Sequence, residues 1–323
     1  MRNNTDRTAV VTGASSGVGL EAAAQFATAG YGRVVITARS DAKAAKTADQ
    51  LRSTTGADVF EAVSLDLDDL TAAAAAAQAI IDRVGTVDAL VLNAGIPPVP
   101  ELRRTDDGIE SIAAATLTGH HLLTMLLLDA DALSADARIV IAGSEAARGD
   151  VPMMNPLDID ALATEAFDGD IASAIDAVLR LQPPVKYHPN NQYATVKVFA
   201  AWWAAELAVR LPDGVTVNAV SPGNTPDTNA TNRAPAFIRR VMVPVMKLIP
   251  GMSHSIAQAA ARYVDATNLG PEVTGKFFAS PPKKMTGALT EVHIPHFTNP
   301  AAQRALFDVA DAIVGRESKS AKS

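Results

Sequence analysis

The chain has 323 residues, of which 48% are hydrophobic and 20% are charged, and it carries a net charge of −7 at neutral pH and no cysteine. This composition indicates a globular protein with a large core. It excludes disulfides and thiol chemistry, and it argues against nucleic acid as a partner, because binding a phosphate backbone requires a basic surface.

The ends and the apolar stretches of the chain bear on its location. No charged and then apolar leader opens the sequence, and the longest apolar run, at 71–81, is alanine-rich and too short for a membrane span. We therefore expect a cytoplasmic protein without a stable membrane span. The polar end at 316–323 is expected to form a flexible tail.

Short β-branched runs alternate with alanine-rich helical patterns along the chain. Strands are expected at 9–13, 33–38, 59–67, 87–95, 137–144, 214–223 and 275–280, and helices at 19–30, 41–56, 70–85, 107–132, 191–211 and 254–266. This alternation predicts βαβ units. The expected fold class is therefore α/β, a Rossmann-type doubly wound parallel sheet of about seven strands in one domain, 1–323.

Two regions interrupt the alternation. Residues 150–190 are acidic and contain several prolines, which indicates an insertion with one or two helices. Such an insertion should lie over the substrate end of the sheet, where doubly wound folds bind ligands. Residues 224–252 include the stretch "FIRRVMVPVMKLIP", which is apolar, rich in methionine and broken by prolines, unlike a regular core helix.

A glycine-rich turn joins the first strand to the first helix. The stretch "VVTGASSGVGLE" places Gly13, Gly17 and Gly19 where bare backbone can approach a pyrophosphate at the positive end of a helix. The required context, a strand before and a helix after, is met. The alternative is an ordinary tight turn.

The spacing TGxxxGxG resembles that of the short-chain dehydrogenase/reductase family. Further landmarks follow in the family's order: "LVLNAG" at 90–95 matches its NAG motif, "LDL" at 65–67 its adenine-contacting acid, and "SPG" at 221–223 its turn near the nicotinamide. The resemblance covers most of the chain and is strongest to retinol-dehydrogenase-like NADP-dependent members. It implies a cofactor site formed by Gly13, Ser15, Ser16, Gly17, Val18, Gly19, Arg39, Asp66, Leu67, Asn93, Ala94, Gly95, Tyr193, Lys197, Pro222, Gly223 and Thr225.

The end of the second strand indicates which nicotinamide cofactor is used. NAD-specific sites place an acid there for the ribose hydroxyls, whereas a 2′-phosphate needs a cation. The strand ends "VVITARSD", so Ala38 leaves out the carboxylate and Arg39 supplies a cation. We therefore expect NADP(H), unless Arg39 only caps a surface loop.

The stretch "QYATVK" places Tyr193 and Lys197 one helical turn apart on one face. In the family these residues are the catalytic pair, and the lysine lowers the pKa of the tyrosine so that it can donate and accept a proton. Ser144, in "RIVIAGSEA", matches the family's substrate-polarising serine. The alternative is an ordinary amphipathic helix.

The sequence departs from the family at one catalytic position. The family usually carries an asparagine in the helix before the fifth strand, where it anchors a water of the proton relay. Comparison of "ATLTGHHLLT" with the retinol-dehydrogenase-like pattern puts Thr116 there. A threonine can also hydrogen-bond water. Slowed activity is expected, and altered or lost activity is the alternative.

Several other residues were considered as functional. We expect His120, His121, His293 and His296 to be packing or surface residues and not metal ligands, and Trp202 and Trp203 to serve core or subunit packing. In the family, the segment after the "SPG" turn is a substrate loop, so 224–252 could be a lid, with a subunit interface or transient membrane contact as alternatives. Thr225 or Thr228 would contact the carboxamide.

These features predict an NADPH-dependent oxidoreductase that transfers a hydride between nicotinamide and a lipophilic ketone, aldehyde or secondary alcohol. The expected assembly is a homodimer or tetramer. Two alternatives remain open at this point: a catalytically weakened, cofactor-binding regulator, and a reductase of a different bond type.

Overall fold

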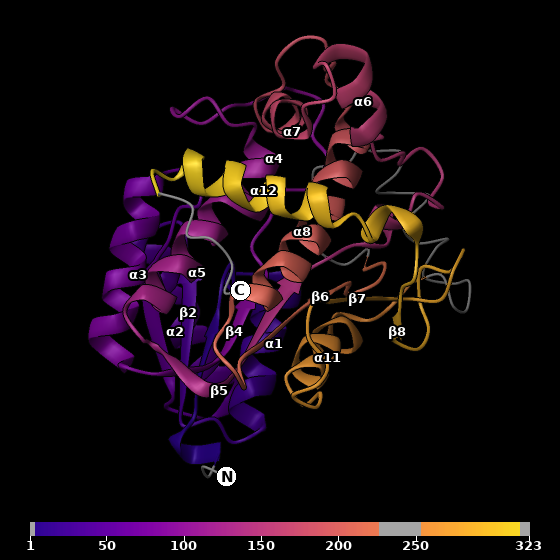
Figure 1. The fold of residues 1–323 in the computed structure, drawn as a ribbon. Helices are drawn as coiled ribbons and strands as arrows, with labels where there is room; N and C mark the ends of the chain where they lie inside the picture. Colours follow the sequence, from indigo (N-terminus) through magenta and orange to yellow (C-terminus); the bar gives the residue numbers. More distant parts are fainter. Residues whose placement is uncertain (1–3, 226–252, 317–323) are drawn as a thin grey trace.

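The central strands are buried along their whole length. Every residue of β1 (Thr8–Val11), β4 (Val87–Leu92) and β6 (Thr216–Val220) is buried, as is typical of parallel strands covered by helices on both faces. The computed structural model describes residues 4–225 and 253–316. In these residues eight strands form one sheet in the order β3-β2-β1-β4-β5-β6-β7-β8 (Figure 1).

The expected parallel sheet is confirmed, with one addition. Its other strands are β2 (Arg33–Ala38), β3 (Phe60–Ser64), β5 (Leu133–Ala142), β7 (Lys276–Ala279) and β8 (Thr290–Glu291). Among the described residues, β1 to β7 pair in parallel and β8 pairs with β7 in antiparallel fashion, so the count is eight and not seven. A strand of two residues is too short to show a periodic pattern. The order reverses between β1 and β4, where doubly wound sheets bind ligands.

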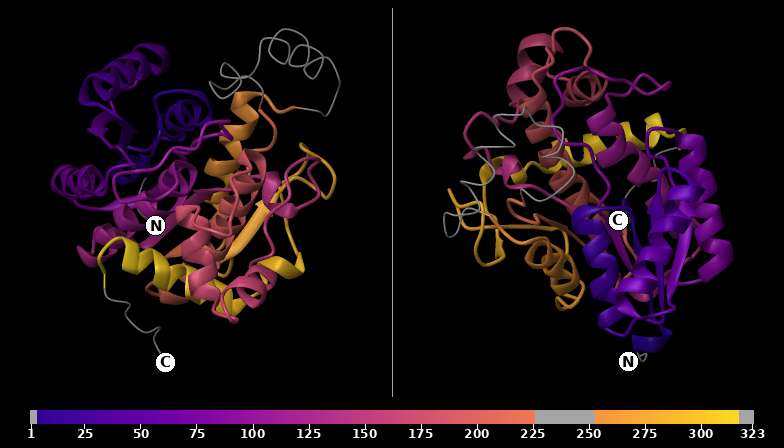
Figure 2. Two further views of the ribbon diagram at one scale, coloured as in Figure 1. Left: turned by 90° about the horizontal axis from the view of Figure 1, so that it is seen from above. Right: turned by 180° about the vertical axis from the view of Figure 1, so that it is seen from behind.

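Helices cover both faces of the sheet (Figure 2). One face packs against α1 (Gly17–Thr28), α2 (Asp41–Thr55) and α11 (Ile256–Ala266). The opposite face packs against α3 (Leu70–Val84), α5 (Gly119–Asp129) and α8 (Pro189–Arg210). On this side α12 (Pro300–Ile313) crosses α8 as a further layer (Figure 1). Two short 3-10 turns, η1 (Asn4–Asp6) and η5 (Pro295–Phe297), complete the connections.

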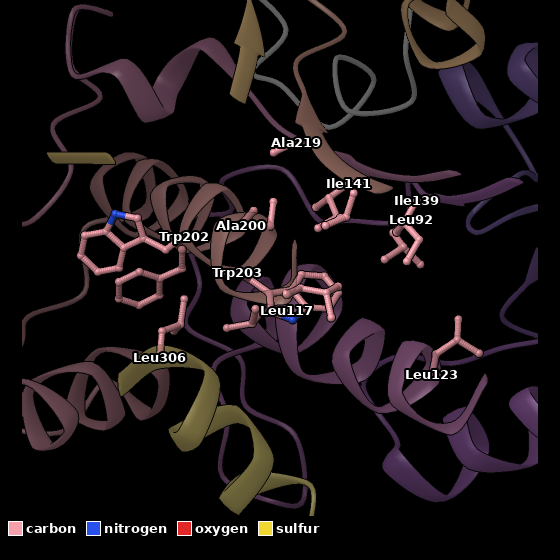
Figure 3. Close-up of a cluster of buried hydrophobic side chains, with 14 of the residues drawn as sticks. Leu92, Leu117, Leu123, Ile139, Ile141, Ala200, Trp202, Trp203, Ala219 and Leu306 are labelled. Carbon is pink, nitrogen blue, oxygen red and sulfur yellow. The ribbon is translucent and has the colours of Figure 1, made fainter. Parts of the chain in front are cut away.

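The two adjacent tryptophans of α8 lie in the core beneath α12. Figure 3 shows Trp202 and Trp203 among side chains from the sheet, from α5 and from α12. Trp203 is fully buried, and the Trp202 indole donates a hydrogen bond to the His296 carbonyl at 2.7 Å. They therefore serve packing within the chain, one of the two roles expected for them.

The helix expected at 107–132 is interrupted. It consists of α4 (Ser111–Ala113), a π-helical segment η2 (Ala114–Thr118) and α5. Within the described residues, Ser111–Asp129 is the one stretch long and apolar enough to cross a membrane, but 83% of its window is buried inside the protein. Buried core helices pass the same test.

The region 150–190, for which one or two helices were expected, carries two, α6 (Ile159–Ala166) and α7 (Ile171–Arg180), after a 3-10 turn η3 (Glu145–Arg148). Hydrogen bonds from the Leu157 N–H to the Thr195 hydroxyl at 2.9 Å and from the Gln192 amide to the Val178 carbonyl at 3.2 Å attach it to the first turns of α8. The insertion thus braces the start of the helix that carries Tyr193. From 226 to 252 the expected substrate loop lies outside the described residues, as does the tail from 317.

Candidate active site

The glycine loop after β1 is shaped so that only glycine is accommodated. Gly13 and Gly17 have φ values of +63° and +60°, which disfavour other residues. A Cβ atom on Gly13 would lie 2.8 Å from the Ala94 Cα, and one on Gly19 would lie 2.3 Å from the Asn93 amide nitrogen. That amide donates to the Thr12 carbonyl at 2.9 Å, so the NAG segment supports the loop. The loop is therefore a bare-backbone cradle and more than an ordinary turn.

A cavity of about 400 Å³ lies above this cradle, at the carboxyl ends of the strands. Most of the expected cofactor residues line it: Gly13, Ser15, Ser16, Gly17, Val18, Gly19, Arg39, Leu67, Asn93, Ala94, Gly95, Tyr193, Lys197, Pro222 and Thr225. Other lining residues were not anticipated: Thr37, Ala38, Lys43, Leu65, Asp68, Ile96, Pro97, Ala115, Ala142, Gly143 and Tyr263. None of the residues 150–190 is among the lining residues of this cavity. That the insertion lies over the substrate end of the sheet stays a prediction.

Two acids lie close together in the loop after β3, and the expected contact of Asp66 with adenine stays a prediction. Asp66 accepts a hydrogen bond from the Asp68 N–H at 3.1 Å and is not among the lining residues. Asp68 lines the cavity and pairs with Arg39 at 3.7 Å. Burial raises the pKa of Asp68, and Arg39 opposes that shift. The sequence alone could not separate these two acids, because the loop after β3 has no periodic pattern.

A second cation accompanies Arg39. Lys43, on the first turn of α2, lines the same end of the cavity. Ser40 caps this helix by accepting from the Lys43 N–H at 3.4 Å, which holds its first turn against β2. The sequence offered one clue to the role of Lys43. It lies four residues after Arg39, in the first turn of the helix that begins at residue 41, and this places it close to the end of β2.

Tyr193, Lys197 and Ser144 meet at the other end of the cavity. The Lys197 ammonium lies 5.7 Å from the centroid of the Tyr193 ring and donates a hydrogen bond to the Ala142 carbonyl at 2.7 Å. The Ser144 hydroxyl lies close enough to the Tyr193 phenol to lower its pKa. Ser144 follows Ala142 and Gly143 of the cavity wall but is not itself in the lining.

Burial dominates the protonation of this group. It raises the pKa of Tyr193 above 10, the Ser144 hydroxyl opposes the rise, and the Glu145 carboxylate adds to it. Burial also lowers the pKa of Lys197 to about 8. The direction for Tyr193 is opposite to the expected lowering by Lys197, because desolvation disfavours the phenolate.

Thr116 lies in the π-helical segment η2, behind the NAG motif. Its hydroxyl is buried without a hydrogen-bond partner and lies 3.7 Å from where a Cβ of Gly95 would be. Its carbonyl accepts from the His120 ring at 3.2 Å. Ala115, and not Thr116, lines the cavity. The structure thus keeps Thr116 close to the site but not in its wall.

The turn after β6 closes the cavity near Tyr193. Pro222, Thr225 and Tyr263 of α11 line it. Gly223, expected as a cofactor residue, is not in the lining; its N–H donates to the Ser221 hydroxyl at 3.2 Å. Thr228, the alternative to Thr225, lies outside the described residues. Tyr263 escaped the sequence analysis because an isolated tyrosine in a helix carries no motif.

The remaining histidines have structural partners. His121 bonds Asp311 at 2.9 Å, His296 bonds the Ala147 carbonyl at 2.8 Å, and the exposed His293 lies 3.7 Å from Glu291. The described residues contain no group of three or more His, Asp or Glu side chains that could hold a metal ion.

The described geometry fits a dinucleotide. The glycine cradle leaves backbone free at the N-terminus of α1, where an anionic pyrophosphate is favoured, and the cavity runs from the cations Arg39 and Lys43 to Tyr193. Its volume is in the range of small-molecule and cofactor sites.

Comparison with known proteins agrees with this site. A family profile described as short chain dehydrogenase matches residues 7–156, the part that carries the glycine loop, the NAG motif and Ser144. The chain belongs to the short-chain dehydrogenase/reductase family, whose members are oxidoreductases, and it is similar to the retinol-dehydrogenase-like members. The expected family and fold are therefore confirmed.

Two relatives and one solved structure define the degree of similarity. Human retinol dehydrogenase 13 is 28% identical over 320 residues, which cover 98% of this chain and 87% of that protein. Dehydrogenase/reductase SDR family member 13 from Bos taurus is 30% identical over 275 residues, which cover 85% of this chain and 66% of that protein. A variant of actinorhodin polyketide ketoreductase, solved with NADPH, shares the fold with a TM-score of 0.62 at 22% identity and covers 86% of this chain and 96% of that one.

Proposed function

We propose that the protein is an NADPH-dependent carbonyl reductase or alcohol dehydrogenase. The observation that carries the proposal is the meeting of Tyr193, Lys197 and Ser144 at one end of a cavity whose floor is a glycine cradle. Two neighbouring hydroxyl groups beside a buried ammonium can bind a carbonyl oxygen and exchange a proton with it.

Each catalytic side chain has one task in this proposal. Ser144 donates a hydrogen bond to the substrate oxygen, and Tyr193 donates a proton to it during reduction or accepts one during oxidation. Lys197 offsets the negative charge that develops on the Tyr193 oxygen. When bound, the nicotinamide cofactor supplies or accepts the hydride. Thr116 supplies a hydroxyl that can hydrogen-bond a water of the proton relay. This hydroxyl lies behind Gly95, 3.7 Å from the position that a Cβ atom on Gly95 would occupy.

The proposed preference for NADPH depends on Arg39 and Lys43. Both line the end of the cavity opposite Tyr193, and Ala38 ends β2 without a carboxylate. Two cations suit a 2′-phosphate better than a pair of ribose hydroxyls. Asp68 partly offsets them through its contact with Arg39 at 3.7 Å.

The proposed substrate is a lipophilic carbonyl compound or the corresponding alcohol. Support comes from the similarity to a protein named retinol dehydrogenase 13 and from the apolar sequence after the "SPG" turn. Retinal, the aldehyde of retinol, is therefore the first compound to test, followed by long-chain aldehydes and ketones. A cytoplasmic location remains part of the proposal.

A catalytically weakened, cofactor-binding regulator is the second candidate. It is favoured by one observation: the position of the family's relay asparagine holds a threonine whose carbonyl is already bonded by His120 at 3.2 Å. Both candidates predict cofactor binding, so only turnover separates them.

The test is the substitution Tyr193→Phe, with NADPH and NADH binding followed by nicotinamide fluorescence and turnover measured over the aldehyde panel. We expect turnover to fall by at least about 10³-fold while NADPH binding changes little, because only the proton-transferring hydroxyl is removed. The matched control is Tyr187→Phe, which removes a hydroxyl that bonds the Val99 carbonyl outside the cavity and should keep most activity. Wild-type protein that binds NADPH but turns over none of the panel would favour the regulator.

A further inference from the structure

We propose that the buried pair Glu145–Arg262 is a positioning device that holds the Ser144 hydroxyl, the turn at Pro222 and the loop 280–287 in one rigid arrangement and sets the charge around Tyr193. This inference rests on the proposed function for its kinetic consequences. Glu145 directly follows Ser144, and Arg262 directly precedes Tyr263 of the cavity wall.

Glu145 is almost fully buried, yet both its carboxylate oxygens have partners. One oxygen accepts from the Ser221 hydroxyl. The other accepts from the Ser280 N–H at 3.2 Å and the Ser280 hydroxyl at 2.9 Å, and it lies 3.5 Å from Arg262. Burying a carboxylate is costly unless such partners compensate it. The side chain therefore ties the end of β5 to the ends of β6 and β7.

Arg262 extends these ties to the wall of the cavity. It donates to the Ser221 carbonyl at 2.9 Å, to the Ser280 hydroxyl at 3.1 Å and to the Gly287 carbonyl at 2.7 Å. It is adjacent in sequence to Tyr263, whose side chain lines the cavity. The guanidinium thus joins α11, the turn after β6 and the loop 280–287.

The loop 280–287 in turn fixes the turn that follows Pro222. The Gly287 N–H donates to the His254 ring at 3.1 Å, and the other ring nitrogen of His254 bonds the Pro222 carbonyl at 3.2 Å. The Asn224 N–H donates to the Met285 carbonyl at 2.9 Å. A displacement of Glu145 would therefore move Ser144 and the Pro222 turn relative to each other.

The Glu145–Arg262 pair also contributes to the electrostatic potential at the Tyr193 hydroxyl. The charged or titratable groups near Tyr193 are Glu145 on η3, Lys197 on α8 and Tyr263 on α11. Glu145 raises the pKa of Tyr193, and Arg262 lies 3.5 Å from the carboxylate of Glu145. Loss of the carboxylate charge should therefore lower that pKa, an effect that a purely structural role would not produce.

The experiment compares Glu145→Gln, which keeps the shape but removes the charge, with Ser221→Ala, which removes one link of the network. We expect Glu145→Gln to lower kcat by about 10- to 100-fold with less than a threefold change in NADPH binding. We also expect the titration of Tyr193 to shift to lower pH, because a neighbouring negative charge is removed. That titration is followed by NMR of ¹³Cζ-labelled tyrosine and assigned with Tyr193→Phe, so it does not depend on turnover. Ser221→Ala should lower kcat without that shift.

Arg148→Lys is the matched control. Arg148 is also buried and holds the same loop through the carbonyls of Ser280, Pro281 and Lys284, but it is paired with Asp150 and not with Glu145. An unchanged Tyr193 titration in Glu145→Gln, or equal losses of kcat in Glu145→Gln and Arg148→Lys, would overturn the inference. Absence of turnover in the wild type would refute the proposed function instead, and the NMR titration would still decide whether Glu145 acts on Tyr193.

Discussion

Single charged side chains decide the chemistry at both ends of the cavity. At one end Tyr193 is surrounded by a hydroxyl, an ammonium and a carboxylate. At the other end, Arg39 and Lys43 line the cavity together with Asp68, which lies 3.7 Å from Arg39 and would compete with a 2′-phosphate for that cation. The cations at this end favour NADPH, whereas Asp68 opposes the binding of its 2′-phosphate. We therefore expect a single substitution here to change the preference between NADPH and NADH.

Asp68→Asn should tighten NADPH binding about threefold to tenfold, because it frees Arg39 for the phosphate while keeping the shape of the side chain. NADH binding should change little. Lys43→Ala should weaken NADPH binding by a similar factor, with the effect shrinking at high salt because Lys43 is exposed. Fluorescence titrations of both cofactors at two ionic strengths provide the measurement. Weaker binding of NADH in Asp68→Asn would show that Asp68 holds the ribose and would reverse the proposed preference.

At the scale of elements, a buried polar chain connects β1, β4 and the interrupted helix. The Ala94 N–H donates to the Thr12 hydroxyl at 3.0 Å, that hydroxyl bonds the His120 ring at 2.9 Å, and the ring bonds the Thr116 carbonyl at 3.2 Å. Because Thr12 already accepts from Ala94, its hydroxyl proton can point to His120, which keeps the imidazole neutral. This chain joins the glycine loop, the NAG motif and the π-helical turn.

His120 should make the protein acid-sensitive. Burial lowers its pKa to about 3, whereas in the unfolded chain the value is near 6.5. Above pH 6.5, His120 therefore does not lower the free energy of unfolding. As the pH drops from 6.5 toward 3, protonation of His120 in the unfolded chain lowers that free energy by up to about 1.4 kcal/mol per pH unit. In His120→Gln, which is less stable at pH 7, that part of the pH dependence should vanish.

Urea unfolding midpoints between pH 7 and pH 4 measure this difference. The exposed His293 supplies the control, since His293→Gln should leave the wild-type pH dependence intact. Parallel curves for wild type and His120→Gln would mean that His120 is not neutral in the folded protein.

Across the whole molecule, α12 joins the far end of the chain to the catalytic helix. Phe307 on α12 is buried, with its ring centroid 4.1 Å from the Arg210 guanidinium carbon and 4.9 Å from the centroid of His121. This packing covers a face of α8 within one chain. The expected homodimer or tetramer would therefore have to form through another surface.

Phe307→Ala should destabilise the protein by about 3–5 kcal/mol, because it leaves a cavity between α12 and α8. Val209→Ala is the control on α8, since Val209 is 62% exposed and its truncation should cost less than about 0.5 kcal/mol. Urea denaturation measures both, and size-exclusion chromatography with light scattering gives the assembly state. A loss below about 1 kcal/mol for Phe307→Ala would contradict a packing role for α12.

Much of the fold could be predicted from local pattern. Parallel strands such as 87–92 are mostly apolar, and the glycines of the loop mark positions where a Cβ would clash, so both leave a signature in the sequence. The candidate catalytic residues Tyr193 and Lys197 were recognisable because helical spacing places them on one face. The short β8, the break of the helix at η2 and the packing of α12 were not recognisable, since tertiary contacts create them.

The residue pattern alone was sufficient for the family, the α/β sheet, the glycine cradle and the pair Tyr193–Lys197, because each depends on residues close together in the chain. Only the folded chain decided that Asp68 and not Asp66 faces Arg39, that Tyr263 joins the wall, and that Glu145 meets Arg262. These partners come together from elements up to 117 positions apart, as for Glu145 and Arg262. Burial and partner geometry, which no local pattern encodes, determine which polar side chains reach the site.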